Sequence, residues 1–145
     1  AMQSLSEEDF SHLLADLIEN AFIAMSDVPD KKILINLGRI GNHLSVEISD
    51  NGQPFLPEIF QDFGLKPHTT HAENGGSGIG LMDIWKLKKK YRASLVITEY
   101  ASGTYSYTKQ ISLIFDAKKH YIIQTYRKHE LGQIRFRDDL YIFPY

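Results

Sequence analysis

Three glycines alternate with other residues in the sequence GGSGIGL at 75–81, directly before an apolar segment with helical spacing. Because glycine has no side chain, the backbone N–H groups of such a segment can approach a phosphate closely. The N-terminus of the following helix adds the positive end of its dipole at the same place. The pattern predicts a phosphate-binding loop that opens a helix. Glycine-rich turns are common, so this segment alone does not identify a nucleotide site.

The composition is that of one globular domain and excludes several kinds of site. The chain has 145 residues, of which 43% are hydrophobic and 23% charged, and its net charge is −2. Without cysteine it has neither disulfides nor thiolate metal ligands. The basic run at 86–92 favours the solvated end of a helix over a nucleic-acid patch. No apolar run reaches the length of a membrane span, so we expect a cytoplasmic domain that contacts neither nucleic acid nor membrane.

The spacing of apolar residues predicts two helices and two hairpins. Apolar residues recur at helical intervals over 7–25, after serines and acids typical of a helix start, and again over 79–91. They alternate with polar residues over 33–48 and over 95–115, which is typical of antiparallel hairpins. The order predicts an α+β fold, a two-layer α/β sandwich in which helices cover one face of a mixed sheet.

A carboxylate and a carboxamide stand side by side on the first predicted helix, at Glu19 and Asn20. Asn20 falls between the core positions Leu17 and Ala21, so its amide needs a polar partner. A hydrated Mg²⁺ ion suits this role because it takes few protein oxygen ligands and keeps its waters. Glu19 can orient or deprotonate an acceptor group beside it. Taken alone, the fragment favours a simpler alternative, a surface glutamate next to a locally bonded asparagine.

The sequence Asp50-Asn51-Gly52 directly follows a predicted strand. A buried Asp50 at this point can accept a hydrogen bond from an exocyclic amine such as that of adenine, and Gly52 leaves room for a flat ring. Asp-Asn-Gly is also an ordinary turn sequence. Taken alone, the turn is the simpler interpretation.

In this order the three fragments resemble the Bergerat-fold (GHKL) ATPases, the family that includes DNA gyrase, heat-shock chaperones and histidine kinases. The resemblance runs from about Phe10 to Phe115 and is to the catalytic ATP-binding domain of a bacterial sensor histidine kinase. It implies ATP and Mg²⁺ as cofactors and a Bergerat fold with a long ATP-lid loop. We expect a histidine-kinase-like ATP-binding domain at 3–117 and a β-rich C-terminal extension of the same domain at 118–145.

The resemblance also implies a role for each matched residue. Asn20 would ligate the Mg²⁺ ion that bridges the ATP phosphates, and Glu19 would be the catalytic base or polarising group beside it. Asp50 would bind the adenine amino group, with Gly52 next to it. The remaining nucleotide-binding positions would be Gly76, Ser77, Gly78, Gly80, Leu81, Thr70 and Thr108.

A long segment without regular pattern, 64–75, corresponds to the ATP lid of this family. A short helical turn is expected before it at 57–63, where the residues resemble the family's F-box. Within the lid, His68, Thr70 and their neighbours can contact the phosphates, and a solvated loop is the alternative. A zinc site is not expected because no cysteine or carboxylate cluster completes one.

Three positions depart from the family's pattern. Asp16 stands where many relatives have an asparagine, Ile23 where many have a phosphate-contacting lysine, and Pro54 replaces a glycine of the motif at Asp50. The strand and helix that usually precede the first helix are missing or lie outside this sequence. The residues after Lys118 are therefore candidates for replacement strands, expected over 121–126, 133–137 and 140–143. These departures weaken the expectation of turnover more than that of nucleotide binding.

The resemblance implies a protein histidine kinase of a two-component signal transduction system, an ATP-dependent phosphotransferase. None of the six histidines lies in a phosphoacceptor context. We therefore expect the phosphoacceptor histidine on a dimerisation segment of a longer parent protein. That parent protein could be anchored in the membrane. A response regulator is expected as a further partner. The isolated domain would only bind ATP or hydrolyse it slowly. The alternatives are an anti-sigma-factor-type serine kinase and a non-catalytic nucleotide-binding regulatory module.

Overall fold

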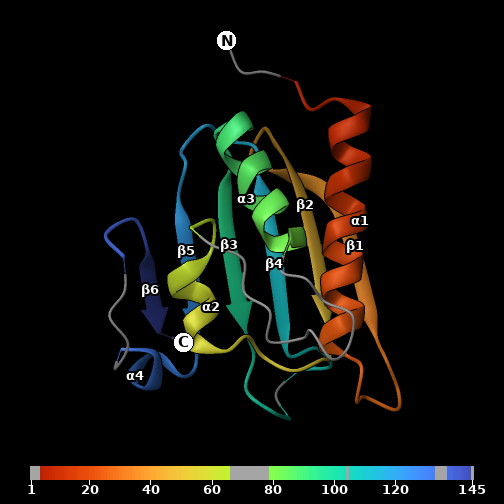
Figure 1. The fold of residues 1–145 in the computed structure, drawn as a ribbon, viewed down its shortest axis with the longest axis vertical. Helices are drawn as coiled ribbons and strands as arrows, with labels where there is room; N and C mark the ends of the chain where they lie inside the picture. The colour runs from red at the N-terminus through yellow and green to blue at the C-terminus, as the bar shows by residue number, and fades with distance from the viewer. Residues whose placement is uncertain (1–3, 66–78, 104, 133–136, 145) are drawn as a thin grey trace.

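A six-stranded mixed sheet forms one layer of the protein (Figure 1). The computed structural model describes residues 4–65, 79–103, 105–132 and 137–144. The strand order is β1-β2-β4-β3-β5-β6, with antiparallel pairing from β1 to β3 and parallel pairing of β3 with β5 and of β5 with β6. The strands are β1 (Ile33–Ile40), β2 (His43–Asp50), β3 (Ser94–Glu99), β4 (Lys109–Ile114), β5 (Tyr121–Thr125) and β6 (Tyr141–Pro144).

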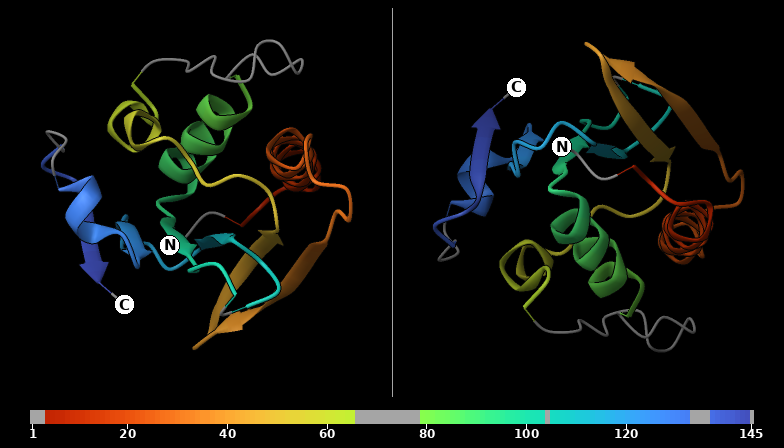
Figure 2. Two further views of the ribbon diagram at one scale, coloured as in Figure 1. Left: turned by 90° about the horizontal axis from the view of Figure 1, so that it is seen from below. Right: turned by 90° about the horizontal axis from the view of Figure 1, so that it is seen from above.

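Helices α1, α2 and α3 cover one face of this sheet (Figure 2). The helix α1 begins after Ser6, whose Oγ accepts a hydrogen bond from the backbone N–H of Asp9 at 3.1 Å. Such a cap satisfies one of the backbone donors that a helix start leaves unpaired. The helices are α1 (Glu7–Ala24), α2 (Pro57–Asp62), α3 (Ile79–Tyr91) and the short α4 (Lys128–Leu131).

Alternation of residue types along the strands gives the sheet one apolar face and one polar face. In β2, Val46 and Ile48 are at most 2% exposed and belong to the hydrophobic core. Between them, Glu47 accepts a hydrogen bond from the hydroxyl of Ser112 in β4 at 2.8 Å. A sheet with a single apolar face needs helices on that face only, and the α+β sandwich expected from the sequence is confirmed.

The elements differ from expectation in a few places. The strand expected over 105–115 is shorter, since β4 covers only Lys109–Ile114, and α4 was not expected. The strands expected over 121–126 and 140–143 are present as β5 and β6, and they continue the same sheet beyond β3. Residues 133–136 of the remaining expected strand lie outside the described residues. No helix in the described part of the chain has the length and apolarity needed to cross a bilayer.

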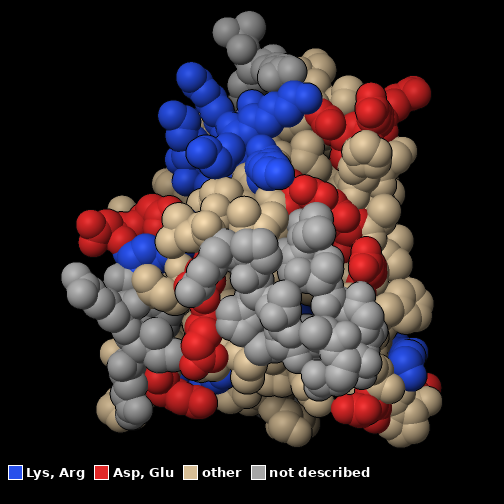
Figure 3. Space-filling model, in the orientation of Figure 1, with Lys and Arg blue, Asp and Glu red and all other residues tan. Residues whose placement is uncertain are grey.

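Basic side chains gather at the C-terminal end of α3 (Figure 3). Lys89 and Lys90 are in the last turn, where cations favour the helix dipole, as expected. Lys88 departs from the interpretation of a solvated run because it is only 6% exposed. Its ammonium donates to the backbone carbonyl of Lys119 at 3.1 Å. The helix end is therefore partly fixed to the segment that leads into β5.

Candidate nucleotide-binding site

The carboxylate of Asp50 is buried at the end of β2, with 1% of the residue exposed. Its Oδ1 atom accepts hydrogen bonds from the backbone N–H of Gly52 at 2.8 Å and from Nζ of Lys109 at 2.9 Å. The bond to Gly52 makes the local turn that the sequence Asp-Asn-Gly favours. The turn and the buried acceptor, which the sequence presented as alternatives, are thus both present in one structure.

Gly52 packs directly against the end of α1. A Cβ atom on Gly52 would lie 2.5 Å from both the carbonyl carbon and the carbonyl oxygen of Ala24. The next residue, Gln53, donates its backbone N–H to the same Ala24 oxygen at 2.8 Å. The need for glycine at this position is therefore set by the close approach of the loop to the helix.

Thr108 lies beside Asp50 and Gly52, and its expected contact with the nucleotide remains a prediction. Its backbone N–H donates to the Asp50 carbonyl at 2.8 Å, and its Oγ1 donates to the Gly52 carbonyl at 2.6 Å. Residues at the ends of the neighbouring strands β2 and β4 are thus held together at one end of the sheet.

Asn20 is half-buried on α1, and its Nδ2 atom is buried without a hydrogen-bond partner among the described residues. Leaving a buried donor unpaired costs roughly 1–3 kcal/mol, and such groups often mark a place where a ligand or water binds. The neighbouring Glu19 is exposed. The two residues that the sequence paired therefore have different surroundings.

Asp16 lies one turn before Asn20 and faces the start of α3. A Cβ atom on Gly80 would lie 3.8 Å from Oδ1 of Asp16, so the first turn of α3 contacts α1 here. Burial, together with the nearby carboxylates of Asp83 and Glu19, raises the pKa of Asp16 to about 6, and His12 opposes this shift. A groove of about 270 Å³ between the two helices contains Asp16, His12 and Asp83 in its lining.

Within the described ranges, no group of three or more histidine, aspartate or glutamate side chains is arranged to hold a metal ion. A Mg²⁺ ion bound to phosphates needs only one or two protein ligands, so a protein-built cage is not required. The Oδ1 atom of Asn20 is the one that could ligate such an ion, whereas its unpaired Nδ2 is a donor and suits an acceptor such as a phosphate oxygen.

Several expected phosphate contacts lie outside the described residues: Thr70, Gly76, Ser77, Gly78 and the ATP lid beyond Leu65. Leu81, another expected contact, is partly buried and packs against the hydrophobic core. The phosphate contacts remain predictions.

Residues 6–117 match the family described as histidine kinase-, DNA gyrase B- and HSP90-like ATPases. The chain belongs to this ATPase family. Nitrogen regulation protein NtrY of Azorhizobium caulinodans is 28% identical in an alignment of 98 positions, which covers 64% of this chain and 12% of that protein. A mycobacterial sensor histidine kinase, MprB, has a similar fold, with a TM-score of 0.58 at 18% identity over 76% of this chain and 72% of that one.

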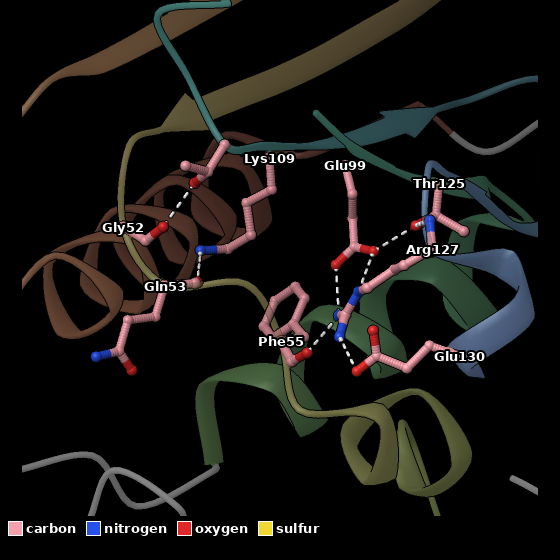
Figure 4. Close-up of polar contacts among 9 residues, drawn as sticks. Gly52, Gln53, Phe55, Glu99, Lys109, Thr125, Arg127 and Glu130 are labelled. Atoms are coloured by element: carbon pink, nitrogen blue, oxygen red, sulfur yellow. Dashed lines mark hydrogen bonds and ion pairs between the residues drawn. The ribbon is translucent and has the colours of Figure 1, made fainter. Parts of the chain in front are cut away.

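Two buried ion pairs of this ATPase domain were not anticipated from the sequence. Lys109 pairs with Asp50, and Arg127 pairs with Glu99 through Nε and Nη2 at 2.8 and 2.7 Å. The cations also bind the loop after β2, since Lys109 donates to the Gln53 carbonyl at 2.8 Å and Arg127 to the Phe55 carbonyl at 2.5 Å (Figure 4). The only local sign of a buried ion pair in the sequence was the position of Lys109 in β4. Because side chains alternate along a strand, Lys109 points to the same inward face as Ile111.

Two more side chains from beyond the matched segment bind the short helix α2. The hydroxyl of Tyr121 donates to the Phe60 carbonyl at 3.0 Å, and the guanidinium of Arg137 donates to the Phe63 carbonyl. Arg137 also lies over the ring of Trp85, 4.6 Å from its centroid. Tyr121 and Arg137 thus fix the segment that precedes the expected lid.

Proposed function

We propose that this domain binds Mg-ATP and serves as the catalytic domain of a sensor histidine kinase, transferring the γ-phosphate to a histidine outside this sequence. The observation that carries the proposal is the buried Asp50 carboxylate, held at the end of β2 next to Thr108 in a member of this ATPase family. The names of NtrY and MprB support a role in signalling. Because the chain covers 12% of NtrY, the acceptor segment and a response regulator are also proposals.

Each part of the ligand would meet a different group of the chain. Asp50 would accept a hydrogen bond from the adenine amino group, and the amides around Gly78 and Gly80 would bind the phosphates. Asn20 would hold Mg²⁺, which would neutralise charge on the phosphates during transfer. Glu19, exposed beside it, would polarise the acceptor histidine. A domain that uses ATP in this way would act in the cytoplasm.

Calorimetric titration with ATP and ADP, with and without Mg²⁺, tests nucleotide binding. We expect both nucleotides to bind and Mg²⁺ to strengthen the binding of ATP, because the ion bridges phosphates that Asn20 then helps to hold. A folded protein that takes up neither nucleotide would contradict the proposal.

A transfer assay then separates the kinase from the two alternatives. The domain is mixed with labelled ATP and the acceptor segment of its parent protein. A histidine kinase gives a phosphoprotein whose label is lost in acid, whereas a serine kinase acting on a protein substrate gives an acid-stable label. A regulatory module gives neither. Two features favour the regulatory module: Asp16 in place of an asparagine and Ile23 in place of a phosphate-contacting lysine.

A further inference from the structure

Lys109 is a fully buried cation in the first position of β4, with 0% of the residue exposed. An ammonium group has three donors and no acceptor. Its Nζ donates to Oδ1 of Asp50 at 2.9 Å and to the carbonyl of Gln53 at 2.8 Å, and it lies 5.2 Å from the centroid of the Phe55 ring. One charged group is therefore bound to three residues of the same loop.

Stability alone does not explain this lysine. Burial lowers the pKa of Lys109, and the charge and hydrogen bond of Asp50 oppose that effect. Replacing a buried ion pair by apolar residues of similar volume is often neutral or stabilising. The other inward residues of β4, Ile111 and Leu113, are apolar core residues. The pair is thus better explained by what it does to Asp50.

Among the described residues, the two hydrogen bonds that the side chain of Asp50 accepts both use Oδ1. One comes from Lys109 and the other from the backbone of Gly52, so the plane of the carboxylate is fixed relative to β4 and to the loop. Within the described part of the chain Oδ2 has no such bond, which leaves it as the oxygen to bind a ligand. An ionised carboxylate accepts hydrogen bonds and donates none.

We propose that Lys109 is a positioning residue that makes the site select 6-amino purines over 6-oxo purines. It keeps Asp50 as a fixed, acceptor-only carboxylate with Oδ2 directed at the base. The amino group of adenine can donate to that oxygen, whereas the carbonyl oxygen of hypoxanthine or guanine would face it acceptor to acceptor. The inference rests on the proposed function, in which Asp50 binds the base.

The test compares ADP with IDP, which differ at the 6-position of the purine and the adjacent ring nitrogen. The wild type is expected to prefer ADP by about 10- to 100-fold, the range for a hydrogen bond to a charged group. Lys109→Met removes the charge and keeps the length of the side chain. We expect this variant to lose most of the preference, with a larger loss of affinity for ADP than for IDP.

Lys88→Met is the matched control, since Lys88 is also buried but bonds the Lys119 carbonyl at the other end of α3. It is expected to keep the ADP preference of the wild type even where its melting temperature falls. A folded Lys109→Met protein with the wild-type ratio of affinities would overturn the inference. Absence of ADP binding by the wild type would instead refute the proposed function.

A second measurement on the wild type does not depend on the folding of a variant. The ¹⁵N resonance of the Lys109 ammonium is followed by NMR during titration with ADP and with IDP. Because Nζ and the base would share the Asp50 carboxylate, saturating ADP should shift the Lys109 resonance and leave that of Lys88 in place. An unchanged Lys109 resonance at saturating ADP would also overturn the inference.

Discussion

The guanidinium of Arg127 and the carboxylate of Glu99 form a bidentate ion pair inside the protein, with side chains that are 9% and 0% exposed. Thr125 completes the arrangement by donating its hydroxyl to Glu99 Oε1 at 2.7 Å. Arg127 lies beyond residue 117, where the family match ends, and it also holds the Phe55 carbonyl. The C-terminal extension is thus bound to the loop that begins at the proposed adenine site.

Glu99→Gln is expected to destabilise the protein by about 3–5 kcal/mol, because Arg127 would keep its charge in a buried place without a counter-charge. Urea denaturation measures the loss. Lys86→Gln serves as control: Lys86 pairs with Asp83 at 3.9 Å with a side chain that is 74% exposed, so it should change stability by less than about 1 kcal/mol. Equal effects of the two changes would mean that Arg127 is not held by Glu99.

Gly52→Ala is expected to destabilise the protein by about 3 kcal/mol, because the new Cβ would overlap the backbone of Ala24, which cannot move aside as a side chain can. Thermal and urea unfolding measure the effect. Gly38→Ala is the control, since a Cβ there would be no closer than 4.0 Å to Ser45 Oγ. A Gly52→Ala protein as stable as Gly38→Ala would show that the loop does not approach α1 this closely.

Long-range pairs limited how much of this site could be predicted from the sequence. The elements followed from local periodicity, and the roles proposed for Asn20, Asp50 and Thr108 came from the family resemblance. Lys109 and Arg127 bond partners that are 59 and 28 residues away in the chain. A charged residue at an inward strand position signals that a partner exists, but the sequence does not say which carboxylate it is. The strand order, which brings β4 beside β2 and β5 beside β3, supplies that answer.

Asn20→Ala is expected to weaken Mg-dependent ATP binding by about tenfold and to leave adenosine binding unchanged, because the amide is expected to hold the metal and not the base. Calorimetry with ATP and with adenosine separates the two effects. Asn36→Ala, at an exposed position of β1, is the control and should change neither. A parallel loss of adenosine affinity would place Asn20 against the base, and identical wild-type ATP binding with Mg²⁺ and with a chelator would refute its metal role.

Asp16→Asn is expected to stabilise the protein at pH 7 by about 1–2 kcal/mol and to have little effect near pH 4. Burial raises the pKa of Asp16 from 3.8 to about 6, helped by Asp83 and Glu19 and opposed by His12. Between these two pKa values the folded protein binds more protons at this site than the unfolded chain does, so the wild type loses stability as pH rises from about 4 to about 6. Urea denaturation across this range measures the effect, with Asp27→Asn at an exposed position as the control. An asparagine has no charge to bury, so the variant should lack this part of the pH dependence. A difference in stability between variant and wild type that stays constant across the range would refute a buried, titrating Asp16.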